Sequence, residues 1–287
     1  SRTFILDKLT SKKKEILKNQ IYYLQNIVQP EQRTNAWYIF RNSTLTASNI
    51  WKIFSTDYTQ NQLIIEKCEP INVDKFKVTN LKSPLHWGQK YEPISIMYYE
   101  YIYNTTVSEF GCIPHKKYSF IAASPDGIVC DENSNIYGRM LEIKNVVSRV
   151  ITGIPKMEYW IQMQLQMEVC DLNECDFLET KFIEFDSYED YKNDITSEYK
   201  GLFLHYTYNN GPYYVYAPFM VNNLESEDYN IWLKEEQEKN KDKEFIDFIY
   251  WKIEKISCIL VMRNKFWFDS VVNDIEYFWK VIEKERS

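Results

Sequence analysis

Two short segments in the middle of the chain restrict its fold most strongly. Residues 124–127 read Ser-Pro-Asp-Gly inside an apolar stretch, and residues 140–143 form a second apolar run after a polar turn. Short apolar runs separated by turn residues predict two strands joined by a turn. Proline fixes its own φ, and the following glycine frees the backbone beside the carboxylate. We therefore expect Asp126 to lie close to Glu142 in the folded protein.

The triplet Glu142-Ile143-Lys144 adds a lysine to these two carboxylates. On a strand the side chains of Glu142 and Lys144 project from one face, while Ile143 points the other way, into a core. Carboxylate oxygens are ligands that Mg²⁺ and Mn²⁺ prefer. An amine beside them could orient or deprotonate an attacking water while the metals offset charge on a phosphate. These residues indicate two-metal phosphodiesterase chemistry. The alternative is an edge strand whose Glu and Lys are simply solvated.

Five elements in one order carry a resemblance to a known family. They are residues 41–48 (similar to Arg-x-Gly-x-x-Thr-Ala-Ser), 87–92 (Trp-Gly-x-x-Tyr-Glu), 124–127, 142–144, and 159–164 (Tyr-x-x-Gln-x-Gln). On these elements the chain resembles the phage lambda exonuclease family, the YqaJ-type viral recombinases within the PD-(D/E)XK nucleases. One departure is Ser43, where the family usually has Gly. It bears on how closely that backbone approaches a phosphate and not on the metal chemistry.

The resemblance implies a site for two Mg²⁺ or Mn²⁺ ions. It assigns Asp126, Glu142 and the backbone carbonyl of Ile143 to the metals, and Glu92 as an additional carboxylate, direct or through water. A surface helix glutamate is the alternative for Glu92. Glu109 resembles a further acid beside the site, with both outcomes open.

Lys144 and two glutamines of the late helix complete the expected active site. Lys144 would position or activate water, and Gln162 would hold Lys144 or the metal-bound water. Gln166 follows four residues later and so falls on the same helical face. Helix glutamines are otherwise usually solvated.

A pocket for a terminal 5′-phosphate is implied as well. The guanidinium of Arg41 can donate two parallel hydrogen bonds to a phosphate, and Ser48 and Ser124 offer hydroxyl donors. The alternatives are a surface salt bridge for Arg41 and a helix cap or turn for the serines. The lysines at 12–14 and 116–117 are further candidate phosphate contacts, or are merely solvated.

The resemblance implies a Mg²⁺-dependent 5′→3′ exonuclease that resects double-stranded DNA ends and leaves 3′ single strands for recombination, repair or genome processing. It also implies a single-strand annealing partner and, in some members, a homo-oligomer. An endonuclease or broad alkaline nuclease could use the same metal site. A non-catalytic module that binds DNA ends or proteins is the third interpretation, although it would not need Asp126, Glu142 and Lys144.

Composition limits the remaining classes. With 45% hydrophobic and 16% aromatic residues in 287, a folded chain with a sizeable core is expected. No apolar run approaches a membrane span, and the N-terminus has no signal-peptide pattern. The six cysteines form no C-x-x-C, so we expect idle thiols in a reducing intracellular compartment, cytoplasm or nucleus. A net charge of −7 opposes nucleic-acid binding unless a basic groove lies on an acidic body.

The pattern of apolar and turn residues predicts an α/β fold, a mixed sheet flanked by helices, which suits the PD-(D/E)XK core. We expect a core at 1–221 with an N-terminal helix, and a C-terminal helical extension at 222–287 packed on it as one unit. The expected helices span 8–28, 36–53, a segment beginning at Ser83-Pro84, 155–169, 243–257 and 265–284. The expected strands lie near 106–114, 117–130, 136–146, 175–185 and 202–219. Residues 55–82 are expected to be an irregular insertion.

Overall fold

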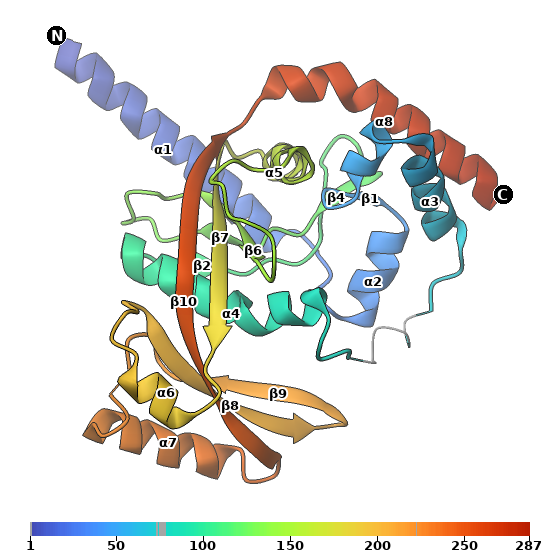
Figure 1. Ribbon diagram of the computed structural model, residues 1–287. Helices are drawn as coiled ribbons and strands as arrows, with labels where there is room; N and C mark the ends of the chain where they lie inside the picture. The colour runs from blue at the N-terminus through green and yellow to red at the C-terminus, as the bar shows by residue number, and fades with distance from the viewer. Residues whose placement is uncertain (1, 73, 75–78, 222) are drawn as a thin grey trace.

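The computed structural model describes the backbone of residues 2–72, 74, 79–221 and 223–287, and side chains within these ranges from residue 10 onward. Within them the strands form two sheets (Figure 1). The larger sheet has the order β2 (Val107–Ser108), β5 (Gly127–Val129), β6 (Met140–Asn145), β7 (Glu174–Glu184), β10 (Glu244–Met262), β8 (Lys200–Tyr208) and β9 (Gly211–Tyr216). Its β6–β7 pair is parallel and its other described pairs are antiparallel. The smaller sheet has the order β1 (Leu45–Thr46), β4 (Ile121–Ala123) and β3 (Ile113–Pro114).

Helices cover both faces of the larger sheet, so the predicted mixed α/β fold is confirmed. The described helices are α1 (Arg2–Asn26), α2 (Asn35–Asn42), the 3₁₀ helix η1 (Ile50–Phe54), α3 (Asp57–Cys68), α4 (Pro84–Tyr103), α5 (Met157–Cys170), α6 (Tyr188–Asn193), α7 (Glu227–Lys239) and α8 (Lys265–Arg286). None of them is both long and apolar enough to cross a membrane.

Strand β6 is sandwiched between α4 and α5. Its Leu141 and Ile143 pack with Tyr99 of α4 in one buried cluster, and Met140 packs with Met163 of α5 in another. Alternation along the strand then places Glu142 and Lys144 on the α5 side. The predicted core position of Ile143 is confirmed, because its side chain is 6% exposed.

The predicted start of α4 is confirmed. The hydroxyl of Ser83 accepts a hydrogen bond from the backbone N–H of His86 at 3.0 Å, and Pro84 occupies the first turn. Such a cap satisfies an N–H that the helix itself leaves free. Asn104 closes the helix in the left-handed conformation at φ 46°.

The helix predicted over 243–257 is wrong. These residues form most of β10, a 19-residue strand paired with β7 on one side and β8 on the other. Two register shifts, at Phe245/Asp247 and Ile253/Lys255, accompany its curved course from α8 to the lower part of the sheet (Figure 1). The periodicity of apolar residues favoured a helix, but hydrogen-bonded pairing with a strand on each side outweighs the local helix preference. Residues 222–287 are therefore not helical throughout, and their strand lies inside the sheet.

Two other predicted segments are divided. Over 36–53, α2 ends at Asn42, and Leu45 then donates its N–H to the carbonyl of Phe120 at 2.7 Å, which begins the parallel β1–β4 pairing. Residues 55–82 are not irregular throughout, because Thr56 caps α3. Positions 73 and 75–78 of that segment lie outside the described residues.

The predicted strands at 106–114 and 117–130 each cross from one sheet to the other. The chain leaves β2 and enters β3 at 109–112, and it leaves β4 and enters β5 at 124–126. Ser124 and Asp126 therefore stand where the two sheets meet.

Candidate active site

Asp126 is fixed beside β6 by the backbone. Its Oδ2 accepts a hydrogen bond from the N–H of Ile143 at 2.6 Å, and Gly127 pairs with Leu141 in the antiparallel β5–β6 ladder. The expectation that the strand pair brings Asp126 near Glu142 is confirmed.

Glu142 is held by an ammonium donor and an amide donor. Its side chain is 1% exposed, its Oε1 contacts the ammonium of Lys144, and its Oε2 accepts from Nε2 of Gln166 at 2.7 Å. The amide oxygen of Gln162 lies 3.5 Å from Nζ of Lys144. Helix α5 thus places both predicted glutamines on the Glu142–Lys144 pair. Tyr159, in its first turn, lies under Lys144, with 5.1 Å from Nζ to the ring centroid.

A second connection joins β6 to α4, and the sequence did not reveal it. Asn145 Nδ2 donates to the carbonyl of Gly88 at 2.8 Å. Its Oδ1 accepts from the hydroxyls of Ser95 at 2.7 Å and Thr180 at 2.6 Å. This buried network holds the helix that carries Glu92 against the strand that carries Glu142 and Lys144.

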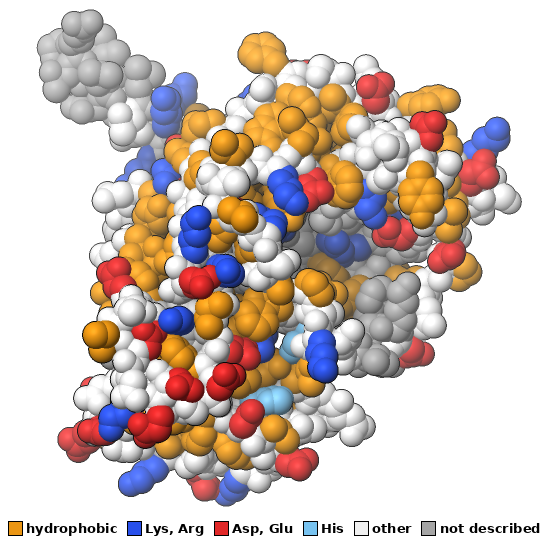
Figure 2. Space-filling view, viewed as in Figure 1, with side chains coloured by type: hydrophobic (Ala, Val, Ile, Leu, Met, Phe, Trp, Pro, Cys, Tyr) orange, Lys and Arg blue, Asp and Glu red, His pale blue; other side chains and the backbone are white. Residues whose placement is uncertain are grey.

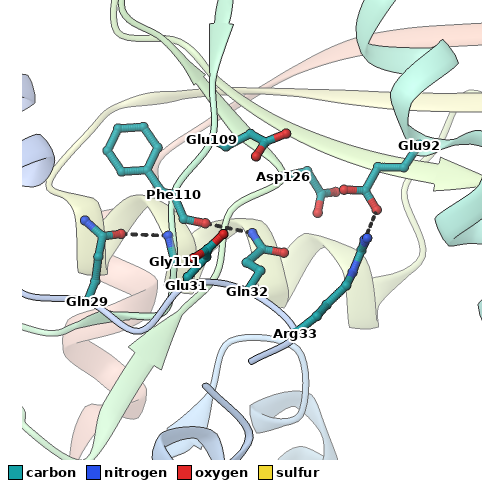
Figure 3. A pocket seen from close by; sticks show the side chains of 9 residues that line it. All are labelled: Gln29, Glu31, Gln32, Arg33, Glu92, Glu109, Phe110, Gly111 and Asp126. Atoms are coloured by element: carbon teal, nitrogen blue, oxygen red, sulfur yellow. Dashed lines mark hydrogen bonds and ion pairs between the residues drawn. The ribbon is translucent and has the colours of Figure 1, made fainter. Parts of the chain in front are cut away.

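Glu92 and Glu109 both reach the site. Glu92 faces Asp126 and pairs through Oε2 with Nη2 of Arg33 at 2.8 Å, as Figure 3 shows. Glu109 lines the same cavity of about 410 Å³, together with Glu31. Glu92 also lines the main groove, so it stands between the two cavities.

The carboxylates are electrostatically unfavourable without a cation. Burial, followed by the charges of Glu142 and Glu92, holds the pKa of Asp126 well above its ordinary value. Burial also raises the pKa of Glu92, and Arg33 offsets only part of this while Glu142 and Glu109 add to it. Burial opposes the charged form of Lys144, but Glu142 and Asp126 outweigh it and raise the pKa of the lysine.

This donor set fits a hard divalent cation. Asp126 and Glu142 supply carboxylate oxygens, with the carbonyl of Ile143 and Glu92 close in the fold, and a bound cation would relieve their mutual repulsion. Within the described part of the chain, no three His, Cys, Asp or Glu side chains are grouped tightly enough to hold a metal by themselves. A cation would therefore also need backbone oxygen or water, as Mg²⁺ commonly does.

The three predicted phosphate donors come together at one place. Nη2 of Arg41 donates to Oγ of Ser48 at 3.0 Å, and the indole N–H of Trp37 donates to Oγ of Ser124 at 3.0 Å. The guanidinium of Arg41 stacks 4.3 Å from the centroid of the Trp37 ring. Trp37 therefore orients two of the three residues. Its position four residues before Arg41, on the same helical face, could have identified it.

A groove of about 620 Å³ contains both groups. Its lining includes Arg41, Ser48, Ser124, Asp126, Glu142, Lys144, Gln162, Arg149 and Arg33. The surface in Figure 2 is hollowed between its upper and lower parts, with Lys or Arg side chains inside the hollow. Asp and Glu side chains gather below, where Figure 1 places α6 and α7. Among the described residues, four cationic side chains thus line the groove beside three carboxylates, in a protein with a net charge of −7.

The lysine runs lie elsewhere. Lys116 and Lys117 stack on the rings of Tyr23 and Tyr118 and line a separate cavity of about 280 Å³. The lysines at 12–14 are exposed on α1. Neither run lines the groove.

A mixed sheet between helices, with Asp126 on one strand connection and Glu142 and Lys144 on the next strand, defines the PD-(D/E)XK nuclease fold. Residues 36–173 match the sequence model of the YqaJ-like viral recombinase domain, so this part of the chain is similar to that family. The resemblance drawn from the five sequence elements is confirmed.

Comparison with known proteins agrees with this assignment. An uncharacterized protein, R354, of Acanthamoeba polyphaga mimivirus is 30% identical over 323 aligned residues, which cover 94% of this chain and 57% of the relative. The chain thus spans little more than half of that relative. The crystal structure of LHK-Exo, an alkaline exonuclease from Laribacter hongkongensis, superposes with a TM-score of 0.51 at 18% identity, covering 88% of this chain and 94% of that one. A structure of LHK-Exo with dAMP gives the same values. These solved structures share the fold.

Proposed function

We propose that the protein is a metal-dependent 5′→3′ exodeoxyribonuclease that degrades one strand of duplex DNA from its ends. The observation that carries this proposal is that one groove contains both the Arg41–Ser48–Ser124 cluster and the Asp126–Glu142–Lys144 cluster. A terminal phosphate held by the first cluster would present the adjoining part of its strand to the second. The family and the fold of an alkaline exonuclease support the same activity.

The chemistry assigns a task to each residue. Asp126, Glu142, the carbonyl of Ile143 and Glu92 would hold Mg²⁺ or Mn²⁺, two ions per site, which supply charge stabilisation and an activated water when bound. Lys144 lies against Glu142 and close to Asp126, so it would position or activate the attacking water beside the metals. Gln162 and Gln166 keep Lys144 and Glu142 in position.

The products define the proposed partners. Removal of one strand leaves a 3′ single strand, which a single-strand annealing protein could bind for recombination, repair or genome processing. We also propose a homo-oligomer and an intracellular, reducing environment, on the resemblance to the family and on free cysteines throughout the described chain.

One assay separates the candidate activities. Linear duplexes labelled at either end, with and without a 5′-phosphate, are incubated with Mg²⁺ beside a covalently closed circle. We expect loss of the 5′-phosphorylated strand and survival of the circle, and no turnover by Asp126→Ala or Glu142→Ala. Equal cutting of circle and linear DNA would establish the endonuclease instead. Absence of turnover on every DNA would leave the non-catalytic binding module.

Arg41→Ala tests end recognition. A charge-assisted bond to a phosphate contributes roughly 1.5–3 kcal/mol, so degradation of linear duplex should slow about tenfold or more. The preference for 5′-phosphorylated ends should disappear, whereas any residual nicking of circles should be unchanged. Equal loss on linear and circular DNA would show that Arg41 supports the fold or general DNA binding.

A further inference from the structure

The connection between α1 and α2 contains a five-residue segment at 29–33, which we call the strap and which passes beside the site (Figure 3). It is tied to the 109–112 connection and to Pro125 by four hydrogen bonds. These are Gly111 N to Gln29 Oε1 at 2.7 Å, Cys112 N to the carbonyl of Pro30 at 3.0 Å, and Gln32 Nε2 to the carbonyls of Phe110 at 2.8 Å and Pro125 at 3.3 Å. The strap is therefore a fixed wall of the site and not a loose loop.

Arg33, the last residue of the strap, has a strained backbone. Its φ is 66°, in the left-handed region that glycine enters freely and a long side chain does not. Strain of this kind persists where the surrounding structure maintains it, and it is concentrated at functional sites. A glycine would relieve the strain, so the presence of arginine directs attention to what its side chain does.

The Arg33 side chain lies between the two cavities of the site. It lines the groove together with Arg41 and Lys144, and it lines the smaller cavity as the cation among Glu31, Glu92 and Glu109. Its Nη2 pairs with Oε2 of Glu92 at 2.8 Å. The side chain remains 47% exposed, and a guanidinium has five N–H donors, so most of them are available to a ligand in the groove.

We propose that Arg33 is a further substrate-binding residue, which donates to a phosphate of the DNA strand in the groove. The proposal rests on the proposed nuclease function. Glu92 is the partner of Arg33 in this structure and also a candidate ligand of the divalent cation. If Glu92 held a cation, its attraction for Arg33 would weaken, and the rigid fork of the guanidinium would be free to bind phosphate oxygens in the groove.

The test uses Arg33→Gly and Arg33→Lys, with Lys18→Ala as a matched control. Lys18 also forms an exposed ion pair with a glutamate, Glu132, but on α1 and away from the groove. Binding of a 5′-phosphorylated duplex is measured by fluorescence anisotropy in Ca²⁺ over a range of salt. Loss of one charge-assisted phosphate contact should weaken binding by Arg33→Gly about tenfold and lower the slope of log Kd against log salt by about one. Arg33→Lys should fall between wild type and Arg33→Gly, and Lys18→Ala should change affinity less than twofold.

Thermal unfolding shows whether Arg33 serves the fold instead. Arg33→Gly should unfold at or above the temperature of the wild type, because glycine accepts this φ. If it unfolds lower, Arg33→Lys decides, because lysine keeps a positive charge at this position: an affinity above that of Arg33→Gly supports the proposal, and an affinity equal to that of Arg33→Gly overturns it. Equal affinities and salt slopes for Arg33→Gly and Lys18→Ala also overturn it. Failure of the wild type to degrade linear DNA in Mg²⁺ would remove the proposed function, which is a separate outcome from the affinity ratio.

Discussion

At the scale of single residues, the site depends on charges kept out of water. Lys67 is 4% exposed, yet its ammonium donates to the carbonyl of Arg41 at 2.5 Å, in the last turn of α2. Burial lowers the pKa of Lys67 from 10.5 to about 8, and Glu66 only partly offsets this. A buried ammonium is thus retained directly behind the arginine that is proposed to hold the DNA end.

This shift predicts a pH-dependent stability. The pKa of Lys67 is lower in the folded state than in the unfolded state. Its contribution to the free energy of unfolding is therefore present above pH 10.5 and is lost as pH falls towards 8, because the buried amine then takes up a proton. The free energy of unfolding of the wild type, relative to Lys67→Met, should rise by about 3 kcal/mol between pH 8 and 10.5. Urea denaturation of both proteins at each pH measures the difference, in which other groups cancel. A flat difference would show that Lys67 titrates normally.

Lys144 makes a second prediction at this scale. Lys144→Ala leaves the carboxylates in place but removes the group that orients water, so turnover on linear duplex should fall about 10²–10⁴-fold. DNA binding in Ca²⁺ should be nearly retained. A loss of only two- or three-fold would make Lys144 a structural residue that neutralises Glu142.

At the scale of elements, the segments that carry the site are braced by distant parts of the chain. Arg286, in the last turn of α8, donates to the carbonyl of Lys67 at 2.8 Å and to that of Asn42 at 2.6 Å. It thereby satisfies the C-terminal ends of α2 and α3, where cations are favourable. At its other end α2 is capped by Thr34, whose hydroxyl donates to the carbonyl of Glu31 in the strap at 2.7 Å.

Two glycine substitutions test the strap. A Cβ added at Gly111 would lie 2.0 Å from the carbonyl oxygen of Pro30, so Gly111→Ala must displace the strap. The cost should be about 1–3 kcal/mol of unfolding free energy, measured in urea. Gly88→Ala is the matched control: its Cβ meets nothing within 4 Å on helix α4, and alanine should be neutral or stabilise by up to about 1 kcal/mol. Equal stability of the two variants would mean that the strap yields freely.

At the scale of the whole molecule, the two sheets meet beside the carboxylates of Asp126, Glu142 and Glu92. The fold holds these groups close together although their negative charges repel one another. The pKa of Asp126 is raised, so its contribution to stability is present at low pH and is lost as pH rises through that pKa. At neutral pH without metal, the protein therefore unfolds more easily than its core alone would allow.

Removal and addition of metal should expose this repulsion. In EDTA at neutral pH, Asp126→Asn should unfold at a higher temperature than the wild type, because the charge is gone while the bond from Ile143 N–H can remain. Mg²⁺ should then raise the unfolding temperature of the wild type. At a hundredfold excess of Mg²⁺ over its Kd, the free energy of unfolding should increase by about 2.7 kcal/mol. Asp126→Asn should gain little. An equal response of both proteins to Mg²⁺ would place the cation elsewhere.

Local sequence patterns predicted the features that depend on residues close together in the chain. The Ser83-Pro84 start of α4 depends on a cap within one turn, and the spacing of Glu142 and Lys144 depends on the two-residue repeat of a strand. The approach of Asp126 to Glu142 follows from a short connection between neighbouring strands. Each rests on contacts between residues close in the chain, which is why sequence patterns predicted them.

Tertiary structure decided the rest. Most of strand β10 was predicted as a helix, because the order of its apolar side chains fits the repeat of a helix as well as that of a strand. Hydrogen-bonded pairing with β7 and β8 selects the strand. The division of residues 117–130 between two sheets has no local marker beyond Pro125. Likewise, Arg33 meets Glu92 across 59 positions and Trp37 meets Ser124 across 87. Such pairs depend on how the helices and strands pack together. The residues next to each partner in the sequence do not indicate which distant residue it will contact.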